Sequence, residues 1–293
     1  MLDLKSRLSV RIRRLRRWHR IQRILTESSV SAQTQRLLAQ QYQYAWRSAG
    51  KVPPFAEVGF REFSQNGEDG ILLLIFALIG TTSKRAIELC AGDGIECNTA
   101  NLIINHGWDA LLVDGDAANV ATAQTFYAAH GNTALWPPTV AQAWLTAENV
   151  NDIVASAGFS GPIDLLSLDL DGIDYWIWRA LDTVQPRVVV VEFQTAWGPE
   201  HAMTVRYDPQ FMPTNGQGAG ASLAAFVKLG QEKGYRLVGC ERLGFNAVFL
   251  RNDVGPDAFP AVPAASAFTH PHAQWCVNHS ARVLGLYDWV TVD

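Results

Sequence analysis

Strand-like and helix-like segments alternate along most of this chain, and this alternation constrains the fold more than any other feature. Apolar runs predict strands within 84–96, 108–116, 163–172 and 186–194 and a weaker strand within 139–146, with helical patterns between them. Continuously apolar strands separated by helices indicate a parallel sheet covered on both faces. Two further strands joined by a short turn within 235–253 predict an antiparallel hairpin at the end of the sheet. The expected class is therefore α/β.

The N-terminal segment differs sharply in charge from the rest of the chain. Residues 1–23 carry nine of the 24 Lys and Arg residues but one of the 28 acids, which leaves a formal charge of −12 on the remainder. Apolar residues recur every three or four positions here, so 1–25 is predicted to be a basic amphipathic helical arm. Three roles are open for this arm: binding to an anionic membrane surface, association with a partner or with a second copy of the chain, and packing as a solvated helix on its own domain. The acidic body argues against nucleic acid as a partner.

Breaks in composition divide the chain further. Residues 26–60 read as a Gln-rich helix and a linker, 61–255 as the α/β domain, and 256–293 as a tail packing on it. The four cysteines form no CxxC pair, so neither a zinc knuckle nor a disulfide framework is indicated, and a cytoplasmic location is expected. The tail contains His270, His272, Cys276 and His279, whose spacing matches no familiar zinc pattern.

Several short motifs follow one another in a fixed order. They read FSQNGEDGIL, IELCAGDGIECNTANL, LLVDGD, LTAENVNDIV, DLLSLDLDGIDYWIW, VVVVEFQ, YDP, GASL and GYRLVGCERLGFNAVFLRND. In this succession the chain resembles the FkbM-like methyltransferases, a branch of the class I S-adenosylmethionine-dependent enzymes. The resemblance implies a Rossmann-like sheet and S-adenosylmethionine as cofactor, and it covers about Phe63 to Asp253.

Cofactor-binding residues are expected at three places in that sheet. A glycine turn after the first strand lets the backbone approach a ligand closely, and an acid ending the second strand suits ribose hydroxyls. The turn is not GxGxxG, so a cofactor without a pyrophosphate fits it better. From these arguments and the resemblance together, the candidates are Gln65, Asn66, Glu68, Glu88, Gly92, Asp93, Gly94, Asp114 and Thr146. For Asp116 and Thr146, helix capping is the alternative role. For Gln65, Asn66 and Glu68, the alternative is a helix start whose acids are favoured by the helix dipole.

Acidic residues crowd the ends of the fourth and fifth predicted strands. Asp169 and Asp171 share one face if the strand continues through Asp171, and Glu192 ends the neighbouring strand. Together they are candidates for a Mg²⁺ site, for the general base, or for an acid that orients a hydroxyl. Asp174 is expected to cap the next helix, and His201 in the following loop is a further candidate base.

Two functions remain open on this sequence. The first is an O-methyltransferase acting on a sugar, polysaccharide or glycolipid precursor, held near the inner face of a membrane by its arm. The alternative is a non-catalytic protein of the same fold, recruited to a membrane or larger assembly, and a homo-oligomer is compatible with either. A nicotinamide dehydrogenase is disfavoured because the glycine fingerprint is missing.

Overall fold

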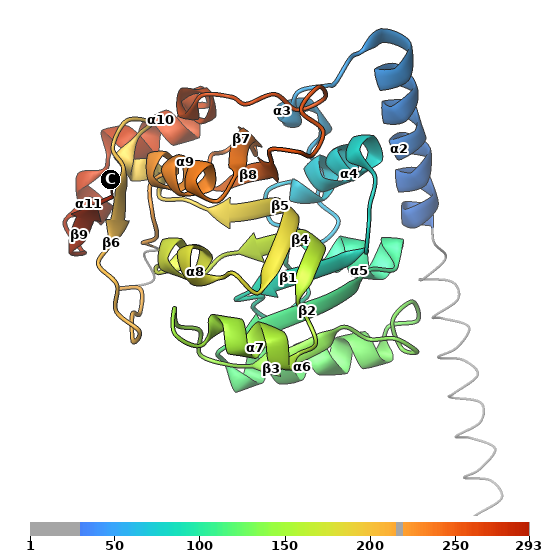
Figure 1. The fold of residues 1–293 in the computed structure, drawn as a ribbon, viewed down its shortest axis with the longest axis horizontal. Coiled ribbons are helices and arrows are strands. Elements are labelled where there is room, and N and C mark those ends of the chain that lie inside the picture. The colour runs from blue at the N-terminus through green and yellow to red at the C-terminus, as the bar shows by residue number, and fades with distance from the viewer. Residues whose placement is uncertain (1–29, 215–218, 293) are drawn as a thin grey trace, which may run out of the picture.

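A computed structural model describes residues 30–214 and 219–292 (Figure 1). Seven strands form one sheet in the order β3-β2-β1-β4-β5-β8-β7. The strands are β1 (Arg85–Leu89), β2 (Asp109–Asp114), β3 (Thr139–Gln142), β4 (Gly161–Leu168), β5 (Val184–Glu192), β7 (Tyr235–Cys240) and β8 (Asn246–Arg251). The first five pair in parallel, and β8 is antiparallel to both β5 and β7. The predicted parallel core and terminal hairpin are confirmed.

Helices cover both faces of this sheet. One face packs α4 (Glu68–Ile79), α5 (Ala100–His106) and α6 (Ala117–Ala129), and the other packs α7 (Val150–Ser156), α8 (Asp174–Ala180) and α9 (Leu223–Glu232). Alternate residues of β1 serve opposite cores, with Ile87 in one and Ala86 in the other. This two-sided burial explains why the strands are apolar throughout. Among the described residues, no helix is long and apolar enough to cross a membrane.

The Gln-rich segment before the sheet forms α2 (Val30–Ala49), followed by the short α3 (Phe55–Val58). Helix α2 is docked on the domain: the Gln35 side chain donates to Asn101 of α5, and the Gln43 side chain donates to the Ala77 carbonyl of α4. The predicted arm at 1–25 lies outside the described residues, so it stays a prediction.

A second, small sheet joins the tail to the insertion that follows β5. Strand β6 (Met203–Val205) pairs antiparallel with β9 (Trp289–Thr291). Between β8 and β9 lie the 3-10 turn η2 (Ala264–Phe268) and the helices α10 (Pro271–Asn278) and α11 (Ala281–Leu284). Helix α10 packs against a second 3-10 turn, η1 (Thr195–Trp197), which follows β5. The tail therefore packs beside the segment that leaves the carboxyl end of β5 (Figure 1).

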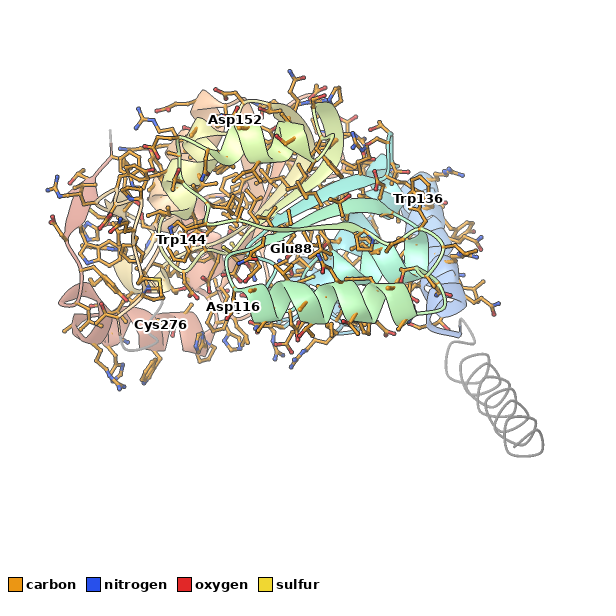
Figure 2. The ribbon with its side chains drawn as sticks, turned by 90° about the horizontal axis from the view of Figure 1, so that it is seen from below. Glu88, Asp116, Trp136, Trp144, Asp152 and Cys276 are labelled. Atoms are coloured by element: carbon orange, nitrogen blue, oxygen red, sulfur yellow. The ribbon has the colours of Figure 1, made fainter. Side chains whose placement is uncertain are left out.

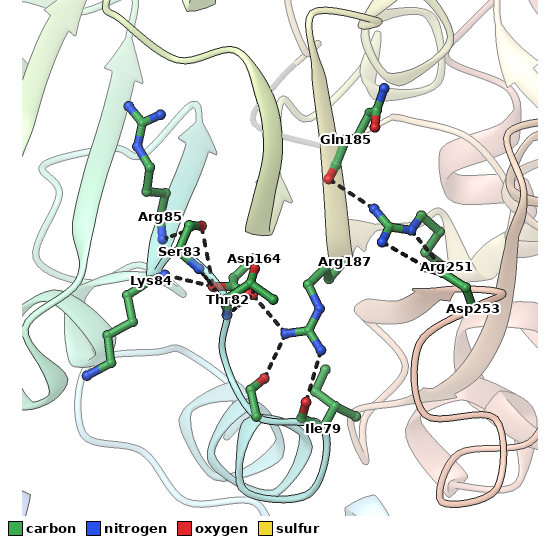
Figure 3. Close-up of polar contacts among 11 residues, drawn as sticks. Ile79, Thr82, Ser83, Lys84, Arg85, Asp164, Gln185, Arg187, Arg251 and Asp253 are labelled. Carbon is green, nitrogen blue, oxygen red and sulfur yellow. Dashed lines mark hydrogen bonds and ion pairs between the residues drawn. The ribbon is translucent and has the colours of Figure 1, made fainter.

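One buried carboxylate fastens the connection from α4 to β1 onto the sheet (Figure 3). Asp164 of β4 is fully buried and accepts hydrogen bonds from the backbone N–H groups of Thr82, Ser83 and Lys84. Its carboxylate also forms an ion pair with Arg187 of β5, whose Nη1 lies 2.9 Å from Asp164 Oδ1. The charge is thus paired and hydrogen-bonded, as a buried carboxylate requires.

Candidate functional site

A cavity of about 410 Å³ lies where β1, β2 and β4 end, a size typical of small-molecule sites. Figure 2 shows Glu88, Asp116 and Trp144 in the same region of the molecule. Six of the lining side chains are carboxylates and none of the lining residues is Lys or Arg. The acids are Glu88, Glu96, Asp114, Asp116, Asp169 and Asp171.

The glycine turn after β1 brings backbone against the cavity. Cys90 and Gly92 have φ of 63° and 56°, so the chain reverses within a few residues. Gly94 at φ 69° packs so closely that an added Cβ would lie 2.9 Å from the Ala123 Cβ of α6. Cys90 and Gly92 line the cavity, whereas Asp93 and Gly94 stand behind it. Asp93 instead accepts the Ile95 N–H and closes the turn.

Glu88 lines the cavity but has a second task that the sequence did not reveal. Its two carboxylate oxygens accept hydrogen bonds from the backbone N–H groups of Asn98 and Thr99 and from the hydroxyls of Thr99 and Ser167. The carboxylate therefore ties the start of α5 to β1 and β4. Glu88 is only 3% exposed, so its main influence on a ligand in the cavity is the electrostatic effect of its negative charge.

Asp114 ends β2, as predicted, and its carboxylate is partly occupied by the protein. Oδ2 accepts the Gly92 N–H at 2.9 Å, while Oδ1 accepts the Asp116 N–H and the Asn119 side chain. Because a carboxylate oxygen accepts about two hydrogen bonds, Oδ2 keeps one acceptor position for a ligand. Asp116 accepts the Ala118 N–H and caps α6, the alternative role considered for it.

An apolar wall closes the cavity on the side of β3. It combines Ala143, Trp144 and Leu145 with Phe211, Met212 and Pro213 of the loop after β6. Trp144 Nε1 donates to the Pro209 carbonyl at 2.7 Å, which joins the two segments. Thr146 lies outside the lining; its N–H donates to Asn149 and its carbonyl accepts from Val150, so it belongs to the turn that precedes α7.

The three acids singled out at the strand ends do meet. Asp169, Asp171 and Glu192 each place one oxygen within 4.8 Å of the others. They do so by a different geometry from the one expected, because β4 ends at Leu168 and Asp171 has a left-handed φ of 57°. A turn, rather than the face of a strand, brings the carboxylates together. Asp169 and Asp171 line the cavity, whereas Glu192 is not part of the lining and is hydrogen-bonded to Asp169.

Burial changes the protonation of this cluster. It raises the pKa of Asp169, whose carboxylate is hydrogen-bonded to Glu192 and lies near Asp174 and Asp171. Burial also raises the pKa of Glu192 well above its usual range, and the charge of Asp169 adds to that rise. Two carboxyls in contact do not readily ionise together, so the strongly raised pKa of Glu192 makes it the proton donor of the pair and Asp169 the acceptor.

Asp174 was expected to cap α8, but it is the first residue of the helix and Ile173 occupies the N-cap position. It is buried and accepts the N–H groups of Leu170 and Gly172, at 2.6 and 3.0 Å. Burial raises its pKa to about 6. The side chain thus folds the turn that presents Asp169 and Asp171 to the cavity.

Asn246 lines the cavity and escaped the sequence analysis. It is 6% exposed and lies opposite Glu192 in the β5–β8 register. Its Nδ2 donates to Glu68 at 2.8 Å, whereas its buried Oδ1 has no hydrogen-bond partner among the described residues. A buried acceptor without a partner is costly, and here it belongs to a residue that lines the cavity. A lone Asn in a hairpin strand gave no signal in the sequence.

The segment before α4 contributes one residue to the lining. Gln65 reaches the cavity, while Asn66 and Glu68 do not; the Asn66 N–H donates to Glu68, which also accepts from Asn246. Asp69 accepts three backbone N–H groups from residues 62–64, and burial raises its pKa. Glu68 and Asp69 therefore shape the loop that presents Gln65.

None of the described histidines lines the cavity. His201 is exposed and its ring centroid lies 6.0 Å from that of Trp197. In the tail, His272 Nδ1 is 2.9 Å from the Leu243 carbonyl and its Nε2 is 3.8 Å from Cys276 Sγ. Across residues 30–214 and 219–292, the acids 169, 171 and 192 are the one group of three or more metal-type ligands.

Comparison with known proteins gives likenesses at low identity. Neither family models nor curated proteins produce a match. Among solved structures, the chain is similar to the N-terminal domain of EvdMO1 with SAH bound, at 16% identity over 74% of this chain and 96% of that one, with a TM-score of 0.42. It is similar to an O-methyltransferase family protein from Burkholderia thailandensis, at 12% identity over 62% of this chain and 57% of that one, with a TM-score of 0.38. It is also similar to the CcbJ methyltransferase from Streptomyces caelestis, at 15% identity over 68% of this chain and 96% of that one, with a TM-score of 0.39.

Proposed function

We propose that this protein is an S-adenosylmethionine-dependent O-methyltransferase, related to the FkbM-like branch by the order of its motifs. The observation that carries the proposal is the cavity lined by six carboxylates and no Lys or Arg. Such a lining attracts a cation and repels phosphate. The sulfonium of S-adenosylmethionine is cationic, whereas NAD carries a pyrophosphate that needs glycine-turn N–H groups or basic side chains.

The proposed cofactor follows the strand ends. Its ribose hydroxyls bind the free acceptor position of Asp114, and its adenine lies against the apolar wall of Trp144 and Leu145. The methionine part then runs past the glycine turn, where Glu88 adds negative charge. This arrangement directs the methyl group toward Asp169, which lines the same cavity.

Asp169 is proposed to be the general base. It takes the proton of the acceptor hydroxyl while that oxygen attacks the methyl carbon, and the C–S bond breaks to leave neutral S-adenosylhomocysteine. The proton held by Glu192 leaves Asp169 as the member of the pair able to accept one. Asn246 Oδ1 is placed to accept a hydrogen bond from the incoming hydroxyl and so to orient it.

A divalent cation is the second way to use these acids. Asp169, Asp171 and Glu192 supply hard oxygen ligands within 4.8 Å of one another, and Asn246 Oδ1 is a further unpartnered oxygen. Mg²⁺ held there would lower the pKa of an acceptor hydroxyl as a Lewis acid. The two proposals differ in the state of Glu192, which is protonated beside a base and ionised beside a metal.

The acceptor is proposed to be an uncharged sugar, polysaccharide or glycolipid hydroxyl. Carboxylates such as Asp171, which lines the cavity, accept hydrogen bonds from hydroxyl groups. The same carboxylates disfavour phosphorylated acceptors such as nucleotide sugars. The basic segment 1–25 is proposed to hold the enzyme at the cytoplasmic face of a membrane.

Calorimetric titration of the full chain with S-adenosylmethionine, S-adenosylhomocysteine and NAD tests the cofactor. Binding of the first two without NAD supports the proposal, and binding of NAD alone contradicts it. Transfer of a labelled methyl group to a panel of neutral sugars and polysaccharides then tests turnover. Cofactor binding with no transfer to any acceptor in the panel would favour the non-catalytic alternative.

A further inference from the structure

The loop between α6 and β3 presents an apolar tip to solvent. Leu135 is 97% exposed and Trp136 is 75% exposed, and Pro137 next to them is exposed as well. Adjacent large apolar side chains on a surface mark an interaction site more strongly than scattered ones. These three residues are called the apolar tip.

The backbone beneath the apolar tip is well fastened. Thr133 is buried and its hydroxyl donates to the Tyr127 carbonyl at 2.6 Å. The N–H of Trp136 donates to the Thr133 carbonyl at 3.0 Å, and Asn132 Nδ2 donates to the Ile104 carbonyl of α5. The side chains are therefore held outward before any partner arrives, which lowers the ordering cost of binding.

Cations surround the nearby end of α5. Arg36 of α2 and Lys84 are both exposed, and neither forms an ion pair with another described residue. Both lie close enough to His106 to help lower its pKa to about 4, an effect due first to burial. This positive potential occurs on a protein whose residues after 23 carry a formal charge of −12.

The basic N-terminal segment joins the structure at the same end of the molecule. Gln35, near the start of α2, donates to Asn101 of α5, and the loop carrying Trp136 also binds α5. Figures 1 and 2 both place that loop on the side of the start of α2. The chain enters α2 at Val30, directly after a segment whose first 23 residues hold nine Lys and Arg.

We propose that the apolar tip and the basic segment together bind an anionic phospholipid bilayer. Tryptophan and leucine insert at the interfacial depth while Lys and Arg approach lipid phosphates, and two such signals are what stable peripheral binding requires. The apolar tip precedes β3, so it lies at the amino edge of the sheet, opposite the strand ends that form the cavity. The bound protein therefore turns its cavity toward the water, which favours a sugar acceptor reached from solution.

Vesicle flotation of the full chain tests this inference without reference to methyl transfer. Phosphatidylcholine vesicles with and without phosphatidylglycerol serve as probes, with wild type, Leu135→Ala/Trp136→Ala and Arg13→Gln/Arg14→Gln/Arg16→Gln/Arg17→Gln compared. The wild type is expected to float with anionic vesicles only. Each variant is expected to bind them at least about tenfold more weakly.

Trp275→Ala is the matched control, because Trp275 on α10 is also an exposed tryptophan, at 48%, in a part of the fold unrelated to the apolar tip. It should float like the wild type. Unchanged thermal unfolding of the tip variant shows that it folds. Equal flotation of wild type and tip variant overturns the inference, as does a wild type that ignores anionic vesicles but is captured by a protein partner.

Discussion

Glu192 and Asp169 carry the same chemical group, but their surroundings favour a protonated Glu192 and an Asp169 that accepts its hydrogen bond. Burial opposes ionisation of both, and the charge of Asp169 suppresses ionisation of Glu192 further. A protonated Glu192 differs from glutamine mainly in having an O–H in place of an N–H donor. The role of each carboxyl can therefore be separated by amide substitution.

Asp169→Asn should lower the rate of methyl transfer by about 10²–10⁴, the usual cost of losing a general base. Glu192→Gln should retain most activity because the amide N–H can still donate to Asp169. Both are measured by labelled-methyl transfer, with and without a chelator. If Glu192→Gln is as damaging as Asp169→Asn and the chelator abolishes wild-type activity, the carboxylates bind a metal instead.

Asp169→Asn should also stabilise the fold, and more so at pH 8 than at pH 5. A carboxyl with a raised folded-state pKa binds more protons in the folded state, so stability falls as pH rises from about 4 through that pKa. Asparagine removes the charge that is poorly solvated at pH 8. Thermal unfolding measures the gain, about 2–4 °C per kcal/mol for a chain of this size. An equal gain at both pH values would contradict the shifted pKa.

Asp114→Asn should weaken S-adenosylmethionine binding, by about 1.5–3 kcal/mol for a lost hydrogen bond to a charged group. Part of the loss comes from the glycine turn, because Asp114 also accepts the Gly92 N–H. Asp116→Asn is the control, since its Oδ1 can still cap α6. Calorimetry measures both, and unchanged affinity in Asp114→Asn would remove Asp114 from the ribose site.

At the scale of the elements, the contacts of Asp164 determine how α4 connects to the sheet. Arg187 Nη1 and Nη2 also donate to the carbonyls of Gly80 and Ile79, so the guanidinium joins β5 to the end of α4 (Figure 3). Burial acts to raise the pKa of Asp164, but the hydrogen bonds from Arg187 and the backbone N–H groups outweigh it and the pKa is lowered.

Arg187→Met should therefore reduce the free energy of unfolding by about 3–5 kcal/mol, because it leaves a buried carboxylate without its counter-ion. Arg206→Met is the control, since Arg206 and its partner Asp288 are both largely exposed and such pairs contribute about 0–1 kcal/mol. Urea unfolding measures both.

The depressed pKa of Asp164 means that its stabilisation is present above about pH 4 and is lost as pH falls through the folded-state pKa. The gap between wild type and Arg187→Met should accordingly narrow below pH 4. Similar losses for Arg187→Met and Arg206→Met at neutral pH would show that the Asp164 pair contributes no more than a surface pair.

At the scale of the whole molecule, the end of the chain fixes one wall of the cavity. The Thr214 N–H donates to the Tyr287 hydroxyl, and the Arg206 N–H donates to the Asp288 carbonyl. Phe211, which lines the cavity, packs against Tyr287 with ring centroids 5.6 Å apart.

Truncation after Gly285 should therefore speed hydrogen exchange at Met203–Val205 and loosen the wall, because β6 loses its pairing with β9. Exchange in β1, deep in the main sheet, serves as the internal control and should change little. Hydrogen exchange with mass spectrometry reports both regions, and unchanged protection of β6 would show that its order does not depend on the tail.

The sequence by itself determined the main sheet. Strands such as VVVVEF are apolar at successive positions, and only a sheet buried on both faces accommodates that pattern. It also placed acids at strand ends, which parallel strands bring to a single edge, so Asp114, Asp169 and Asp171 were found together with the glycine turn. These are local patterns, and local patterns suffice where backbone periodicity decides the structure.

The tertiary structure alone decided what each side chain does at that edge. Glu88 ties α5 to the sheet, Asn246 faces the cavity, and β9 pairs with β6 across a long stretch of chain. The raised pKa values of Asp169 and Glu192 depend on burial and on a contact between the turn after β4 and the end of β5. Solvation and charge proximity are set by neighbours that are distant in the sequence, so no local pattern encodes them.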